Sequence, residues 1–345
     1  MPHINTEIGG TMKKIGLIGC GHIAHTHVTA YQQAGCMLVA CCDENEEKGR
    51  QFAEKYGLAF YGEYQTLLKN KQIDVVSICT PHYLHKEMTV AALEAEKHVL
   101  CEKPLALTSE EGTAVLEAVD RSKKVYGVCY QNRFNDSSLA LKGLLSEQDF
   151  GELKGIKCWV TWHREKEYYL DSSWRGNKAK EGGGVLINQA IHTFDLITWL
   201  TEMPEKIKGK VMTTLLEGYI EVEDTAMATA LLPTGVPVSI YATNSYSSDP
   251  TPELYFDFEK AQIKLTMDEL IINGEPIIDR AATSCEVGKS YWGKGHLRLI
   301  STFLEKIDGQ QNERTDCLAA ADGLTSLKMV EGIYRSDEKN DWINL

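Results

Sequence analysis

The sequence lacks the features of membrane, secreted and nucleic-acid-binding proteins. None of its apolar runs approaches the length that spans a bilayer, and residues 1–12 are polar, without the apolar core of a signal peptide. The formal net charge is −13, so there is no basic stripe to bind a phosphate backbone. We therefore expect a cytoplasmic protein that has neither a nucleic acid nor a membrane as a partner.

Cysteine motifs of metal and redox sites are also absent. The ten cysteines include no C-x-x-C pair, and several of them fall within predicted strands. Buried free thiols behave as small apolar side chains, and they are usual in reducing compartments. We expect reduced core cysteines and no metal site.

What the chain does have is a glycine-rich turn after a short apolar run at residues 15–18. The spacing Gly19-x-Gly21-x-x-Ala24 predicts a strand, a tight turn and a helix that together bind the pyrophosphate of a dinucleotide. Gly19 permits the sharp turn, Gly21 has no Cβ to block the phosphates, and Ala24 lets the helix pack closely on the strand. The predicted cofactor-binding residues of this loop are Gly19, Cys20, Gly21, His22, Ile23 and Ala24, of which Cys20 and His22 receive no chemical role.

An acidic residue follows the second predicted strand, residues 37–42. Asp43 lies about twenty residues beyond the glycine loop, where a carboxylate that binds the ribose hydroxyls of NAD belongs. A carboxylate at this point repels the 2′-phosphate of NADP, and residues 43–47 contain no arginine or lysine. The sequence therefore predicts NAD as the cofactor in preference to NADP.

The hydrophobic pattern changes along the chain. Strands alternate with helices up to residue 129, which predicts a doubly wound parallel sheet. From residue 151 onward, alternation of period two and hairpin-like breaks predict a mostly antiparallel sheet, interrupted by helices over residues 185–200 and 296–307.

These patterns predict an α/β fold with two domains. The first is a Rossmann domain over residues 12–131, and the second is an α+β domain over residues 132–345 with a large open sheet. A last helix, over residues 317–335, is expected to pack back on the first domain.

Two strand ends of the predicted parallel sheet carry candidate site residues. Ligands of such sheets bind beyond the carboxyl ends of the strands. Thr80-Pro81 follows one buried strand, and Glu102-Lys103 follows another. A lysine beside a nicotinamide donates to a substrate hydroxyl and favours its alkoxide, so Lys103 is the sharper candidate.

A second constellation is a run of three glycines, residues 182–184, directly before a predicted helix. The glycines permit close approach of the backbone to a ligand. On the helix, Asn188, His192 and Asp195 are spaced by four and three residues and therefore project from one face. Polar groups on one helix face usually point into water. Because these follow a glycine-rich loop in a chain with a predicted dinucleotide site, we interpret them as candidate site residues.

The chain resembles the Gfo/Idh/MocA family, named for glucose–fructose oxidoreductase and inositol dehydrogenase. The resemblance rests on the glycine loop, on Thr80-Pro81 followed by His85, on Glu102-Lys103-Pro104 and on the block over residues 182–195. It implies NAD(P)-linked oxidation or reduction of a sugar, cyclitol or related polyol, and homodimers or homotetramers formed through the sheet of the second domain. The cofactor contacts that it implies beyond the loop are Thr80, Pro81, His85, Glu102 and Lys103.

Residue by residue, the resemblance makes Lys103 the catalytic lysine and His192 the general acid/base. Asn188 stands where many members of the family have an aspartate, and an amide orients a hydroxyl but takes no proton. In the expected reaction His192 removes the hydroxyl proton as the hydride leaves, and Lys103 stabilises the developing alkoxide. An imidazole suits this role without a large pKa shift.

Segments expected to border the crevice supply four candidate substrate residues, Arg133, Trp174, Arg175 and Tyr291. Arg175, just ahead of the three glycines, is of the type that binds a carboxylate or a phosphate. Two other functions stay open. One is a redox-neutral enzyme that retains NAD and oxidises a hydroxyl transiently to enable elimination or glycoside cleavage. The other is a non-enzymatic NAD-sensing regulator, which the intact Lys103 and His192 disfavour.

Overall fold

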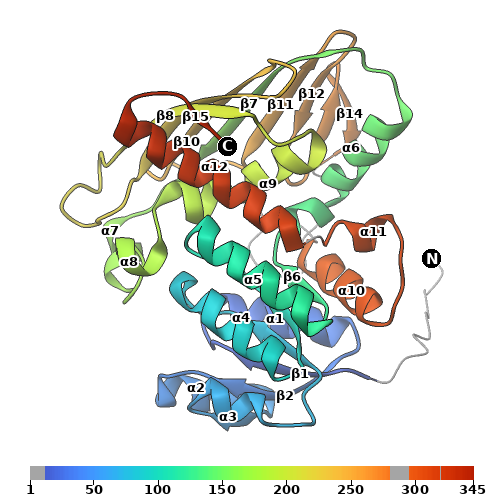
Figure 1. Cartoon of the computed structure of the whole chain (residues 1–345), viewed down its shortest axis with the longest axis vertical. Helices are drawn as coiled ribbons and strands as arrows, with labels where there is room; N and C mark the ends of the chain where they lie inside the picture. The colour runs from blue at the N-terminus through green and yellow to red at the C-terminus, as the bar shows by residue number, and fades with distance from the viewer. Residues whose placement is uncertain (1–11, 280–294, 319) are drawn as a thin grey trace.

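The computed structural model describes residues 12–279, 295–318 and 320–345, and it places two β-sheets one above the other (Figure 1). The first sheet has six strands in the order β3-β2-β1-β4-β5-β6, and all of its neighbouring pairs are parallel, as predicted. This order reverses between β1 and β4, which is where dinucleotides bind in doubly wound sheets. Its strands are β1 (Lys14–Ile18), β2 (Met37–Cys42), β3 (Ala59–Tyr61), β4 (Val75–Ile78), β5 (His98–Cys101) and β6 (Tyr126–Val128).

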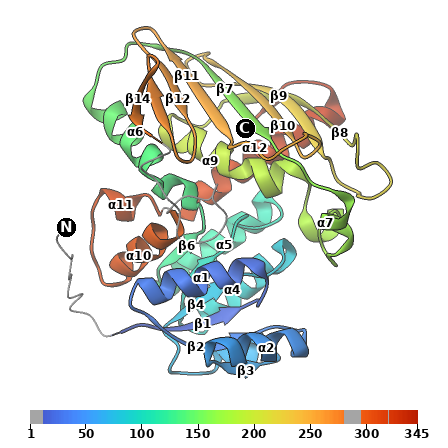
Figure 2. The ribbon, with the colours of Figure 1, turned by 180° about the vertical axis from the view of Figure 1, so that it is seen from behind.

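Helices cover both faces of the first sheet, so its central strands are buried on both sides. Figures 1 and 2 show α4 and α5 over one face and α1 over the other. Local capping explains the helix ends: Asn45 accepts a hydrogen bond from the Lys48 N–H at the start of α2, and Gly57 ends that helix with a left-handed φ of 69°. The helices are α1 (His22–Gln33), α2 (Glu46–Tyr56), α3 (Tyr64–Leu68), α4 (His85–Glu94) and α5 (Ser109–Ser122).

The second sheet has nine strands in the order β14-β13-β12-β11-β7-β10-β9-β8-β15. All its neighbouring pairs are antiparallel except β7 with β10, so the predicted mostly antiparallel sheet is confirmed. One face is packed and the other is open: along β7, Cys158 is buried whereas Trp159 is 46% exposed. The strands are β7 (Leu153–Thr161), β8 (Lys206–Met212), β9 (Thr225–Leu231), β10 (Pro237–Thr243), β11 (Glu253–Phe258), β12 (Gln262–Leu265), β13 (Leu270–Ile272), β14 (Glu275–Ile278) and β15 (Ile343–Asn344).

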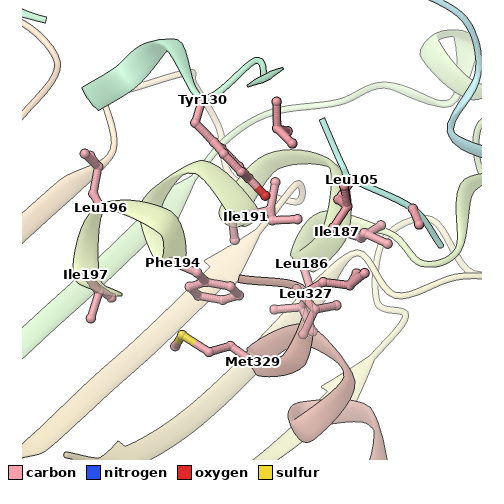
Figure 3. Packing of buried hydrophobic residues seen from close by; sticks show 14 of the residues in the cluster. Leu105, Tyr130, Leu186, Ile187, Ile191, Phe194, Leu196, Ile197, Leu327 and Met329 are labelled. Atoms are coloured by element: carbon pink, nitrogen blue, oxygen red, sulfur yellow. The ribbon is translucent and has the colours of Figure 1, made fainter. Parts of the chain in front are cut away.

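A layer of helices joins the two sheets. In Figure 3, Leu186 and Phe194 pack against Leu327 and Met329 of the last helix. That helix, α12, contacts β8 of the second sheet as well as α5 and β6 of the first. The remaining helices are α6 (Asp136–Glu147), α7 (Lys166–Leu170), α8 (Lys178–Glu181), α9 (Ile191–Leu200), α10 (Gly295–Ile307), α11 (Glu313–Asp316) and α12 (Ala320–Lys339).

Two helices differ from their predicted bounds. The helix predicted over 185–200 opens with a π turn, Leu186–Ala190, before α9 begins. Such turns are frequent at functional sites, and hydrophobic periodicity does not separate them from an α-helix. The helix predicted over 317–335 begins at Ala320, after the separate short α11. No helix of the described residues is long and apolar enough to cross a membrane.

Candidate active site

The glycine loop has the shape that a dinucleotide needs. Gly19 adopts φ +91°, and a Cβ there would lie 2.5 Å from the Cys79 carbonyl oxygen. A Cβ on Gly21 would meet only the Lys48 ammonium, at 3.8 Å, so the loop is open on that side. The helix α1 begins just after Gly21 without a side-chain cap, so a helix N-terminus, which favours an anion, follows the loop directly. These features fit a bound pyrophosphate.

Other loop residues serve the fold. Cys20 and Ala24 are buried in the core beside β1 and β2, and the Cys20 thiol donates to the Cys42 carbonyl at 3.6 Å. His22 is exposed at the start of α1, and Ile23 packs at the edge of the same core cluster. We therefore expect only the backbone of Cys20 and His22 to contact a cofactor.

Asp43 is fixed directly beside the glycine loop. Its two carboxylate oxygens accept hydrogen bonds from the N–H groups of Cys20, at 2.8 Å, and Asn45, at 2.9 Å. Each oxygen keeps a second lone pair, which suits ribose hydroxyls. No sequence pattern indicated that Lys48, one helical turn into α2, reaches Asp43: its Nζ lies 3.4 Å from Oδ2.

At the strand ends, His85 has a different role from the predicted cofactor contact. Its ring nitrogens lie 2.7 Å from the Pro104 carbonyl and 2.9 Å from the Thr80 carbonyl. The buried imidazole therefore ties the loop after β4 to the loop after β5, and a contact of His85 with the cofactor stays a prediction. Thr80 itself offers a buried hydroxyl with no hydrogen-bond partner among the described residues, a group that a bound cofactor would satisfy.

Lys103, Asn188 and Glu181 form a connected polar chain that begins just after the carboxyl end of β5. The Lys103 ammonium donates to the Asn188 backbone carbonyl at 2.9 Å and to its side-chain oxygen at 3.0 Å. The Asn188 amide nitrogen donates in turn to Glu181 Oε1 at 2.6 Å. Burial lowers the pKa of Lys103, and the charges of Glu102 and Glu181 oppose that shift. Lys103 and Asn188, two of the predicted catalytic residues, are thus in contact, and Glu181 joins them although no sequence motif indicates it.

His192 also lies at this site, in an environment that the sequence did not indicate. Burial, and then the charge of Lys103, lowers the pKa of His192 to about 3. The expectation of an unshifted imidazole is therefore wrong, because the ring is only 8% exposed and faces a cation. Its Nδ1 is buried without a hydrogen-bond partner among the described residues, and Tyr130 packs edge-on against the ring.

The three glycines serve packing rather than close approach to a ligand. A Cβ on Gly183 would lie 2.0 Å from the Tyr334 hydroxyl oxygen, and one on Gly184 would lie 1.8 Å from the Glu223 carbonyl oxygen. The Glu223 carboxylate accepts from the Gly184 N–H and from the N–H of Leu186 at the start of the π turn. This glycine run therefore fixes the helix that carries Asn188 and His192.

Glu102 belongs to a buried cluster of titratable side chains. His27 Nε2 lies 2.9 Å from Glu102 Oε1, and His27 Nδ1 lies 2.8 Å from the Ser77 hydroxyl. Burial alone would raise the pKa of Glu102, but the hydrogen bond and charge of His27 hold it well below its usual range. Glu102 is thus a charge paired inside the protein, and its contact with the cofactor stays a prediction.

The same cluster brings together four side chains of metal-ligating type. One ligand atom from each of His27, Glu102, Cys129 and His296 lies within 4.8 Å of the others. They come from four distant segments, so no sequence spacing indicated them. The hydrogen bond between His27 and Glu102 already satisfies the buried carboxylate, and the absence of a metal site stays a prediction.

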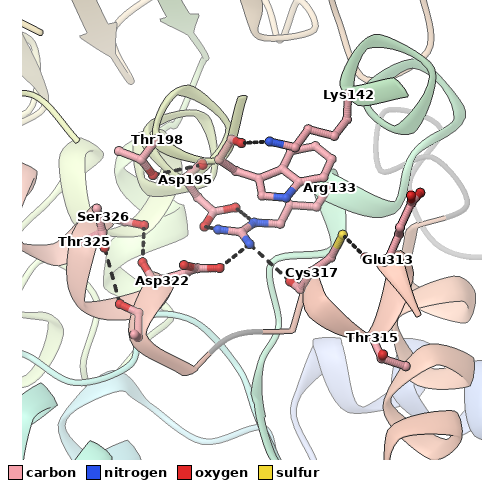
Figure 4. Close-up of polar contacts among 12 residues, drawn as sticks. Arg133, Lys142, Asp195, Thr198, Glu313, Thr315, Cys317, Asp322, Thr325 and Ser326 are labelled. Atoms are coloured by element: carbon pink, nitrogen blue, oxygen red, sulfur yellow. Dashed lines mark hydrogen bonds and ion pairs between the residues drawn. The ribbon is translucent and has the colours of Figure 1, made fainter. Parts of the chain in front are cut away.

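Arg133 is not available to a substrate (Figure 4). Its Nε and Nη2 donate to the Asp195 carboxylate at 2.7 and 2.6 Å, and its Nη1 donates to Asp322 and to the Cys317 carbonyl. All three guanidinium nitrogens are engaged and the side chain is 1% exposed. The predicted substrate role of Arg133 is therefore wrong, and Asp195 is its ion-pair partner rather than a third polar group of the site.

Trp174 and Arg175 do border the site. The Trp174 ring packs on His82 at 4.7 Å, and the Arg175 guanidinium lies over Tyr168 at 4.3 Å. Arg175 is near enough for its charge to lower the pKa of Lys103. Within the described residues it has no ion pair, and its buried Nε has no hydrogen-bond partner. The fourth predicted substrate residue, Tyr291, lies outside the described residues.

A separate hollow lies at the opposite edge of the first sheet. Lys13, Asp74, His98 and Lys124 line it, at the amino ends of β1, β4 and β5. Ligands of doubly wound sheets bind at the other, carboxyl edge, so we assign this hollow no part in the site.

Comparison with known proteins agrees with this arrangement. Residues 13–130 match the model of an oxidoreductase family with an NAD-binding Rossmann fold, and residues 138–264 match the GFO/IDH/MocA C-terminal domain. The solved WlbA dehydrogenase from Bordetella pertussis, in complex with NADH and UDP-GlcNAcA, is 26% identical with a TM-score of 0.85 and covers 97% of this chain and 99% of its own.

Curated relatives match over a smaller part of their length. D-glucoside 3-dehydrogenase of Escherichia coli (strain K12) is 32% identical over 55% of this chain and 54% of its own length. Levoglucosan dehydrogenase of Pseudarthrobacter phenanthrenivorans is 28% identical over 67% of each chain. The chain therefore spans about half to two thirds of the length of these relatives.

Proposed function

We propose that this chain, which belongs to the Gfo/Idh/MocA family of oxidoreductases, transfers a hydride between NAD and a secondary hydroxyl or ketone of a sugar, cyclitol or sugar derivative. The observation that carries the proposal is Lys103, whose partly buried ammonium is held by Asn188 just after the carboxyl end of β5. When bound, the nicotinamide supplies the acceptor or donor of the hydride. The relatives named above are dehydrogenases, which favours net oxidation or reduction over the redox-neutral and regulatory alternatives.

The chain's own residues handle the proton and the charge. Lys103 donates a hydrogen bond to the substrate oxygen and stabilises the negative charge that develops as the hydroxyl loses its proton. His192 accepts that proton. Because its pKa is about 3, it is neutral at physiological pH; the same low pKa makes it a weak base in the direction of oxidation and makes its imidazolium a strong acid for the reverse reaction. Asn188 takes no proton and holds the Lys103 ammonium in place.

The substrate contacts proposed are Trp174 and Arg175. An arginine without an internal counter-ion among the described residues, lying flat on Tyr168, is suited to a carboxylate or a phosphate of the substrate. The structural relative WlbA holds UDP-GlcNAcA, which supports an acidic sugar among the substrates to be tried.

The cofactor proposed is NAD rather than NADP. Two backbone N–H groups hold Asp43, which we expect to bind the ribose of the cofactor. Asp43 also forms an ion pair with the nearby ammonium of Lys48. The Asp43 carboxylate would repel a 2′-phosphate, and Lys48, already paired with Asp43, would not be free to bind it. Both effects favour NAD.

We keep three wider predictions as proposals. The exposed Trp159 and Met227 on the open face of the second sheet, 46% and 50% exposed, support a homodimer or homotetramer formed through that face. The free thiols of the described residues support a reducing, cytoplasmic location. The presence of two separate sheets supports a domain boundary between residues 131 and 132.

The direct test is a panel of cyclitols, aldoses, uronic acids and nucleotide sugars, each supplied with NAD and followed by the absorbance of released NADH. Turnover with stoichiometric NADH is the expected result. Conversion of a substrate without net NADH would instead establish the redox-neutral alternative, and NADH binding without conversion of any member of the panel would favour the regulatory one.

A further inference from the structure

We propose that Glu181 is a positioning residue of the active site, which orients the Asn188 amide so that its oxygen faces Lys103. The proposal rests on the proposed function, because Lys103 is the group on which Glu181 acts. It assigns a role to a carboxylate seven residues before Asn188, on α8, that no sequence motif singled out.

The two ends of the amide have different partners. Asn188 Oδ1 accepts from the Lys103 ammonium at 3.0 Å, and Nδ2 donates to Glu181 Oε1 at 2.6 Å. The reversed amide would set its NH₂ group against the ammonium and its oxygen against the carboxylate, and both contacts would be repulsive. Lys103 and Glu181 therefore fix the orientation between them, and removal of either charge frees the amide to rotate.

Glu181 is itself held from several sides. Its Oε2 accepts from the Gly176 N–H at 2.5 Å, and its backbone carbonyl accepts from His82 Nδ1 at 2.9 Å. The side chain is 1% exposed, so water does not replace these contacts. The carboxylate thus links the loop that carries Trp174 and Arg175 to the helix that carries Asn188 and His192.

The charge state of Glu181 decides whether it performs this role. Burial raises the pKa of Glu181 to about 7, and the neighbouring carboxylate of Glu223 acts in the same direction. Above that pH the carboxylate only accepts hydrogen bonds. Below it, a protonated Glu181 can donate to Asn188 Oδ1 in the reversed amide, and Lys103 then loses an acceptor. The titratable or charged groups around Glu181 are Lys103 after β5, His82 after β4, Tyr169 on α7, Glu223 before β9 and Tyr334 on α12.

The experiment compares the single variant Glu181→Gln with the double variant Glu181→Gln/Asn188→Asp, in which the carboxylate is moved from residue 181 to residue 188. In the single variant, the NH₂ group of the introduced amide must face either Asn188 Nδ2 or the Gly176 N–H, both donors, so one hydrogen bond is lost. We expect kcat to fall about 10–100-fold, since misplacement of a catalytic group has costs of this order. The KM for NAD should stay unchanged, and the fall in rate below pH 7 should disappear. The double variant, which places a carboxylate directly at Lys103, should recover most of the rate.

The matched control is Glu221→Gln. Glu221 accepts from the Asn177 side chain at 2.9 Å and from the Lys178 N–H at 3.0 Å, so it ties the same segment without touching Asn188. The kcat and the pH profile of Glu221→Gln should equal those of the wild type. A wild-type kcat and pH profile in Glu181→Gln, or a folded double variant no faster than Glu181→Gln, would overturn the role of Glu181.

Two further measurements keep the proposal testable if Glu181→Gln does not fold. In Asn188→Asp, a second carboxylate beside Glu181 should raise the pH at which the rate falls, because like charges disfavour ionisation. A ¹³C NMR titration of labelled glutamate carboxyls should show in the wild type one resonance that titrates near pH 7 and moves upward in Asn188→Asp. If Asn188→Asp changes neither the pH at which the rate falls nor the pH at which this resonance titrates, the proposal is overturned. A wild type that turns over no member of the substrate panel would overturn the proposed function, and this role with it.

Discussion

Arg133 and Asp195, 62 residues apart in sequence, form an ion pair with two hydrogen bonds in the helix layer between the two sheets (Figure 4). Asp195 lies on α9, and the third nitrogen of Arg133 donates to Asp322 on α12. The pair therefore joins the segment after β6 to the helix layer of the second sheet. Since both partners are buried, removing one leaves the other as an unpaired charge.

Arg133→Met should accordingly destabilise the chain by about 3–5 kcal/mol, because Asp195 remains buried without its partner. The free energy of unfolding from denaturant titration measures this. Arg50→Met is the control: Arg50 makes an exposed pair with Glu46 one helical turn away, and its loss should change stability by less than about 1 kcal/mol. Equal losses in the two variants would contradict the structural role of Arg133.

Asp43→Ser should shift the cofactor preference toward NADP. The substitution removes the carboxylate that repels a 2′-phosphate and releases Lys48, whose ammonium lies 3.4 Å from Asp43. We expect the ratio of kcat/KM for NADP to that for NAD to rise about tenfold or more, as the loss of a repulsive charge contact allows. Glu44→Ser, at the exposed neighbouring position, should leave the ratio unchanged. Wild-type preference for NADP would refute the assignment of Asp43.

His192→Ala should lower kcat about 10²–10⁴-fold while NADH binding persists, the range for loss of a general base. The pH dependence of the rate is a second prediction. A pKa of about 3 leaves His192 neutral across the working range, so its titration should cause no change of rate near neutral pH. Steady-state rates on both sides of neutrality, with the exposed His163→Ala as control, check both statements. Unchanged turnover in His192→Ala would remove it from the mechanism.

Arg175→Met should discriminate between acidic and neutral substrates. If Arg175 binds an anionic group, kcat/KM for a uronic acid or phosphorylated sugar should fall about 10–100-fold relative to that for a neutral sugar, as expected for a charged hydrogen bond. Arg164→Met is a close control, because Arg164 also lies over Tyr168 but is paired with Asp249. A uniform loss for both kinds of substrate would show that Arg175 only supports the loop.

Features that local sequence determines could be predicted. The glycine loop, Asp43 and the alternation of strands and helices depend on residues close in the chain, and they indicate the parallel sheet and its binding edge. Lys103 and Asn188 can be found because each follows a strong local marker, a strand end or a glycine run. The π turn at residues 186–190 escapes prediction because its hydrophobic pattern is that of an α-helix.

Features that depend on distant segments could not be predicted. Arg133 looks like a substrate residue in the sequence because its partners lie 62 and 189 positions away. The pKa of His192 depends on burial by several elements, which a sequence does not display. Glu181 reads only as a flank of the glycine run. An acidic residue shortly before Asn188, which stands where many members of the family have an aspartate, is the signal that could have found it.

The central claim is that Lys103 stabilises the charge that develops on the substrate oxygen during hydride transfer. Lys103→Met tests it most directly, in single-turnover measurements of NADH formation with saturating NAD and substrate. The control is Lys97→Met, whose native ammonium binds the backbone carbonyls of Asn70 and Ile73 at the opposite edge of the sheet. We expect the rate of hydride transfer at saturating NAD to be lower by about 10²–10³-fold in Lys103→Met and unchanged in the control. A wild-type rate in Lys103→Met would contradict the central claim.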